Sequence, residues 1–119
     1  MPRTAIAINK LARGIGDAQT EPTFTTGDDA NEHYWIYQAG DVLMVRNTGA
    51  ITRTLDVHGP VNELGRAVDA DAKVTVSVSP TVPRFFDLGE LGWTQSGADS
   101  GRIHVDVNHS DLKLAVLRR

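Results

Sequence analysis

Short runs of alternating apolar and polar residues recur along the chain and restrict the folds it can adopt. In residues 73–79 valine alternates with small polar residues, and in residues 102–107 isoleucine or valine alternates with charged or imidazole side chains. A period of two places the apolar side chains on one face of a strand and the polar ones on the other. The sequence therefore predicts strands that are buried on one face only.

The rest of the chain extends this pattern into an all-β fold. Asn47-Thr48-Gly49 is typical of a hairpin turn, and Gly59-Pro60 ends the strand that follows. Because no amphipathic segment of helical length stands out, and residues 61–72 could hold only one short helical turn, we expect a single-domain β-sandwich or a jelly-roll-like barrel. Further strands are predicted over residues 3–8, 33–37, 42–45, 51–58 and 112–117.

Length and composition narrow the number of domains and the classes of function to expect. A chain of 119 residues is one domain, in which we expect residues 1–30 to form an N-terminal arm and a loop. The net charge of −3 counts against nucleic-acid binding, and no apolar run is long enough to span a membrane. The lack of cysteine excludes disulfides and thiolate sites. With no signal peptide predicted, the cytosol is the expected compartment.

Three polar residues near the C-terminus are the strongest candidates for a metal site. His104 and Asp106 share one face of a predicted strand, and His109 follows them. Imidazole and carboxylate groups bind zinc, but polar residues two apart are also what any half-exposed strand presents to water. The solvated face is the favoured interpretation.

The other candidate sites fail on spacing. No serine lies in a nucleophile elbow, and Gly14-Ile15-Gly16 lacks the third glycine of a phosphate-binding loop. Asp28, Asp29 and Glu32 lack the pattern of a calcium-binding loop. We therefore predict no catalytic residue, no cofactor, no metal site and no enzymatic activity.

Aromatic and basic residues are the candidates for contacts with a partner. Phe85 and Phe86 are adjacent, so in a strand one ring must point away from the core. Trp93 is interpreted as a core residue or as an interface anchor. Both ends of the chain carry arginines that could dock on an acidic surface, namely Arg3, Arg13, Arg118 and Arg119.

The order of these elements resembles a family of small proteins from tailed bacteriophages and prophages of actinobacteria. These are encoded near the major capsid protein and are regarded as head-decoration or minor capsid proteins. The likeness depends on β patterns and turn residues, whereas residues 61–70 and 88–93 match nothing in the family. It is carried by residues 2–6, by the arginine-asparagine-threonine turn within 45–49, and by the strands at 51–55, 71–79, 101–107 and 112–119.

The resemblance implies a structural virion protein that binds the capsid exterior and stabilises the shell. Its partners would be the major capsid protein and further copies of the chain, with a trimer expected from capsid symmetry. Such a protein would be made in the cytoplasm of the bacterial host. Contacts are predicted through the arm, the loop at residues 12–30 and the C-terminus, with the partner-binding residues Arg3, Ile6, Arg13, Phe85, Trp93, Arg118 and Arg119.

Two other functions are compatible with the sequence. The chain could be a carbohydrate- or surface-binding β-sandwich, in which Trp93 would act with Gln95 and Asp99. It could also be a tail or connector component of the virion, which would form rings of more subunits than a trimer.

Overall fold

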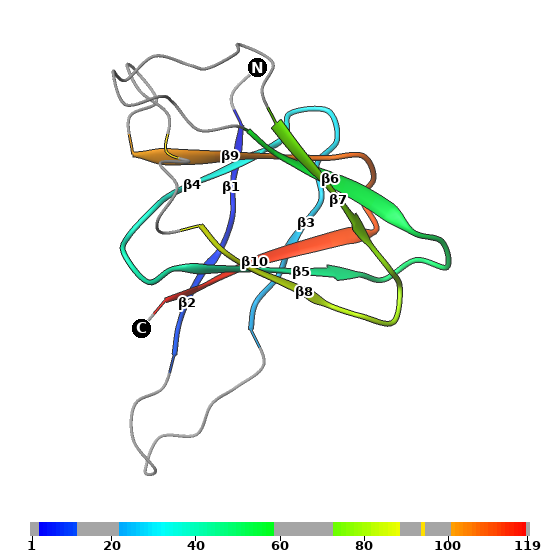
Figure 1. The fold of residues 1–119 in the computed structure, drawn as a ribbon, viewed down its shortest axis with the longest axis horizontal. Coiled ribbons are helices and arrows are strands. Elements are labelled where there is room, and N and C mark those ends of the chain that lie inside the picture. Colours follow the sequence, from blue (N-terminus) through cyan, green and yellow to red (C-terminus); the bar gives the residue numbers. More distant parts are fainter. Residues whose placement is uncertain (1–2, 12–21, 59–72, 89–93, 95–100, 119) are drawn as a thin grey trace.

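A computed structural model shows two β-sheets packed against each other (Figure 1). It describes residues 3–11, 22–58, 73–88, 94 and 101–118. Sheet A has the strand order β1-β4-β9-β6-β7, and sheet B has the order β2-β10-β5-β8 with β3 also paired to β10. The strands are β1 (Thr4–Ala5), β2 (Ile8–Lys10), β3 (Thr25–Thr26), β4 (His33–Ile36), β5 (Val42–Asn47), β6 (Arg53–His58), β7 (Lys73–Val78), β8 (Arg84–Asp87), β9 (Arg102–Val107) and β10 (Leu112–Arg118).

The predicted all-β sandwich is confirmed, because the alternating runs become strands with one face in the core. In β9, Ile103, Val105 and Val107 are buried, while the residues between them are only partly covered. Central strands β5 and β10 differ because they are buried on both faces, and Met44 and Ala115 point away from the sandwich core yet are covered. Among the described residues no helix is long and apolar enough to cross a membrane.

The N-terminal segment belongs to both sheets. β1 pairs in parallel with β4 of sheet A, and β2 pairs in parallel with β10 of sheet B (Figure 1). Between them, Ile6 is 3% exposed and belongs to the core cluster. This part of the predicted arm therefore forms an edge strand within its own chain, and deleting it would remove part of both sheets. The remainder of the predicted loop, residues 12–21, lies outside the described residues.

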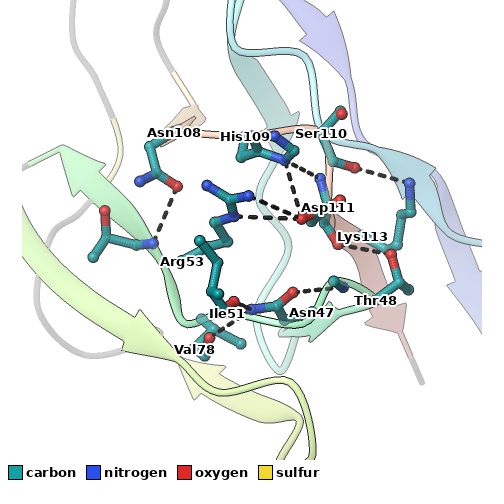
Figure 2. A network of polar contacts seen from close by, with 12 residues as sticks. Asn47, Thr48, Ile51, Arg53, Val78, Asn108, His109, Ser110, Asp111 and Lys113 are labelled. Atoms are coloured by element: carbon teal, nitrogen blue, oxygen red, sulfur yellow. Dashed lines mark hydrogen bonds and ion pairs between the residues drawn. The ribbon is translucent and has the colours of Figure 1, made fainter.

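One end of the sandwich is held together where the β5–β6 and β9–β10 turns meet (Figure 2). Asn47 is 2% exposed; its amide donates to the carbonyls of Ile51 and Val78, and its oxygen accepts from the Gly49 amide. From the other turn, the Asp111 carbonyl accepts from the amide of Thr48. A Cβ on Gly49 would overlap the Asp111 side chain. The predicted hairpin is wrong, because this turn leads from β5 in sheet B to β6 in sheet A, which do not pair with each other. The turn instead joins the two sheets through its contacts to β7 and to the turn before β10.

Candidate interaction surfaces

The outer face of sheet A carries a connected set of charged side chains. At its centre, Asp106 of β9 accepts from Arg3 through one oxygen and contacts His58 of β6 through the other, both at 2.6 Å. His58 and His104 meet edge to face with ring centroids 6.0 Å apart. His104 and Asp106 therefore belong to an ordered network and do not simply form a solvated face.

The three residues of the candidate metal site, His104, Asp106 and His109, do not converge in the described structure. His109 lies in the β9–β10 turn, where its Nδ1 accepts from the amide of Asp111. The carboxylate of Asp28 is occupied by the amides of Ala30 and Asn31. In the described part of the chain, no three histidine, aspartate or glutamate side chains converge as metal ligands would.

Glu32, which contacts this network, has a carboxyl group whose pKa is raised. It adopts a left-handed backbone with φ 66°, and its Oε2 accepts from the Val107 amide at 2.7 Å. Burial, and then the neighbouring negative charge of Asp106, raise the pKa of Glu32 to about 7. A buried carboxyl group next to an ionised one keeps its proton to higher pH.

This raised pKa predicts a pH-dependent stability difference between the wild type and Glu32→Gln. Because the folded pKa is about 7 and the ordinary value is 4.5, the stabilisation from Glu32 is complete below pH 4.5 and is lost as pH rises towards 7. Allowing for solvent screening of this half-exposed group, the free energy of unfolding of the wild type should fall by about 1 kcal/mol relative to Glu32→Gln. Urea unfolding at pH 4.5 and 8 measures it. Asp29→Asn, an exposed change in the same turn, is the control; parallel pH profiles for wild type and Glu32→Gln would contradict the assignment.

Part of the outer face of sheet B is apolar. The strand registers align Ala115 of β10 with Met44 of β5, and Met44 with Phe85 of β8. Residues opposite each other in register point to the same face, so these three form one row across the sheet. The next row pairs Leu117 with Val42, and Val42 with Asp87 of β8, so this row ends in an acidic residue. The apolar members of the two rows are Ala115, Met44, Phe85, Val42 and Leu117. We call these five residues the sheet B patch.

The patch is covered at one end and open at the other. Ala115 is 0% exposed and Met44 8%, whereas the Phe85 ring is 57% exposed. Phe86, the next residue, packs against the core cluster. The predicted opposite orientation of the two rings is therefore confirmed, and Phe85 is the outward one.

A basic row borders the sheet B patch. Arg46 of β5 is in register with Lys113 of β10, one row beyond Met44 and Ala115. The Arg46 guanidinium lies 5.0 Å from the centre of the Phe24 ring, and Lys113 donates to the carbonyl of Ser110. An apolar surface with a positive margin favours a partner whose own margin is acidic.

Three of the predicted partner-binding residues have intramolecular roles instead. Ile6 is in the core, which removes it from any surface, and Arg3 is bound to Asp106 and to the carbonyl of His33. Arg118 forms a two-pronged ion pair with the buried carboxylate of Asp41, so its charge is not free to dock on a partner. These intramolecular contacts were not predicted, because the contacting residues lie far away in sequence and only the strand registers bring them together.

Of the other predicted contact residues, only Phe85 lies exposed in the described structure. Arg13, Trp93 and Arg119 lie outside the described residues, as do Gln95 and Asp99 of the carbohydrate-binding alternative. The sheet B patch as a whole was not predicted. Its signal in the sequence is the apolar content of both faces of β5 and β10.

Comparisons with protein-family models, with curated proteins and with solved structures found no match to this chain.

Proposed function

We propose that this chain is a structural protein of a phage virion, and that it binds the exterior of the capsid shell through the sheet B patch. The major capsid protein is the proposed partner. The proposal of a virion protein comes from the sequence resemblance, and the choice of surface comes from the structure. The exposed Phe85 ring, continuous with the covered Met44 and Ala115, is the observation that carries it.

The exposed ring of Phe85 is suited to binding a partner. Aromatic side chains at the centre of interfaces contribute much of the binding energy, and exposed apolar patches commonly mark interaction sites. The charged residues on sheet A that could have done chemistry are instead bonded to one another, as Asp106 is to Arg3 and His58. A protein that is placed on a shell needs such a stable body and one complementary surface.

The basic row adds a salt dependence to this proposal. Arg46 and Lys113 would face the margin of the contact, where charges steer association and are screened by salt. Capsid lattices offer three-fold positions, and we propose that three copies occupy each of them. Sedimentation of the purified protein, which gives its mass in solution, distinguishes a trimer from the larger rings of a connector.

The test is binding of purified variants to shells assembled from the major capsid protein. Phe85→Ser should weaken cosedimentation by at least about tenfold, because losing a central aromatic anchor costs about 2 kcal/mol or more. Ile51→Ser is the matched control, since Ile51 is 59% exposed but lies at the β5–β6 turn, outside the patch. Its binding should equal that of the wild type, and both variants should keep the wild-type unfolding midpoint. Unchanged binding of Phe85→Ser would exclude the patch, and no binding of the wild type would exclude the function.

A further inference from the structure

His33 occupies a position between the N-terminal strand and the turn that precedes β4. Its side chain is fully buried at the start of β4. Nε2 lies 2.8 Å from the amide nitrogen of Asp28, and Nδ1 lies 3.2 Å from the carbonyl oxygen of Thr4. One imidazole ring therefore joins β1 to the turn at residues 28–32.

The two partners fix the protonation state of this ring. A backbone amide can only donate a hydrogen bond, so Nε2 must accept from Asp28. A carbonyl oxygen can only accept, so Nδ1 must carry the proton that is donated to Thr4. Only the neutral ring with its proton on Nδ1 satisfies both contacts, since a second proton on Nε2 would face the Asp28 N–H.

The 28–32 turn also holds β1 in place. The Asp28 carboxylate accepts from the Thr4 hydroxyl at 3.0 Å, and its carbonyl accepts from the Glu32 amide at 2.8 Å. The Glu32 carbonyl then accepts from the Thr4 amide at 2.8 Å. Displacing Asp28 would therefore remove a side-chain contact of Thr4 directly and disturb its backbone contact through Glu32.

We propose that His33 and the 28–32 turn form an acid-sensitive latch, in which protonation of His33 displaces Asp28 and loosens β1 from the edge of β4. The Thr4 and Ile6 amides, which donate to the carbonyls of Glu32 and Tyr34, would lose their protection from solvent exchange. β2 would stay attached to β10, since its hydrogen bonds and those of Asn9 to Thr23 do not involve the turn.

Several charged groups face His33 or its neighbours. Burial, the largest influence, lowers the pKa of His33 below its usual 6.5, and Arg3 acts in the same direction. Asp28 and Asp106 oppose this shift, and hydrogen bonds hold the pKa of each near 2, so both stay ionised until the pH approaches 2. Glu32, with a pKa of about 7, has already taken up its proton. Arg3 therefore remains tied to Asp106 while the contacts at Thr4 and Ile6 open.

Nuclear magnetic resonance of the full ¹⁵N-labelled chain tests the latch. At neutral pH the ring-nitrogen shifts of His33 should show a proton on Nδ1 only. On acidification, the His33 titration should coincide with at least a tenfold loss of amide protection at Thr4 and Ile6, while the amides of β5 and β10 stay protected. This selective loss separates opening of β1 from global unfolding.

His33→Gln supplies the matched variant, because glutamine offers both a donor and an acceptor but does not titrate in this range. Its Thr4 and Ile6 amides should remain protected across the same pH interval. If this variant fails to fold, the wild-type titration alone decides. A proton on Nε2 at neutral pH, protection that persists through the His33 titration, or simultaneous loss of protection in β5 and β10 would each overturn the proposal.

Discussion

Replacing Arg118 by methionine is expected to destabilise the protein by about 3–5 kcal/mol, the range for removing one partner of a buried ion pair. The Asp41 side chain is 0% exposed, and the Arg118 guanidinium donates to both of its oxygens at 2.9 Å. Burial would raise the pKa of Asp41, but the hydrogen bonds from Arg118 and from the Gln38 amide outweigh it and hold that pKa low. Methionine would leave a buried carboxylate that still accepts from Trp35 but has lost its counter-ion. Guanidinium unfolding at pH 7 measures the change.

The matched control for this pair is Arg84→Met. Arg84 lies in the edge strand β8 and, like Arg118, donates to a backbone carbonyl, that of Ser77, but it is exposed. Exposed charged residues contribute little to stability, so the loss of Arg84 should lower the free energy of unfolding by under about 1 kcal/mol. An Arg118→Met variant as stable as Arg84→Met would show that the Asp41 contact does not stabilise the fold.

Asn47→Leu is expected to lower the free energy of unfolding by about 3 kcal/mol or more. Each backbone group that is left buried without a hydrogen-bond partner costs about 1–3 kcal/mol. The side chain keeps the shape of the β5–β6 turn through Gly49 and bonds the carbonyls of Ile51 and Val78 (Figure 2). Leucine has a similar size but satisfies none of these groups. The unfolding midpoint in urea, with an unchanged slope, reports the loss.

Asn108→Ala tests whether burial is what makes Asn47 important. Asn108 lies in the same corner and its oxygen accepts from the Thr54 amide, but it is exposed, so water can replace it. We expect a cost below about 1 kcal/mol. Equal costs for Asn47→Leu and Asn108→Ala would contradict the assigned role of the buried amide.

The strands could be predicted because their signal is local. In residues 102–107 the alternation alone gives both the strand and its buried face, and β9 has these same bounds. The strand predicted over residues 3–8 is only partly right, since β1 ends at Ala5 and the chain then crosses to sheet B as β2. Pairings between distant residues have no such signal: Arg118 and Asp41 are 77 positions apart, and a basic C-terminus looks the same whether it is free or paired.

The candidate site was predicted only where strand geometry decides it. Adjacent Phe85 and Phe86 had to point to opposite faces, but which ring enters the core depends on the register of β8 against β5. Asn47 was assigned to a turn by its residue type, whereas its buried contact to the Val78 carbonyl depends on how β7 packs. Neither packing nor register can be derived from a pattern of period two.

The measurement that tests the central proposal most directly is electron cryomicroscopy of virions that contain this chain. The proposal predicts density for the two-sheet body on the capsid exterior, with the outer face of sheet B against the shell and Phe85 within the contact. Density that places sheet B towards solvent, or that places the chain in the tail or connector, would contradict it.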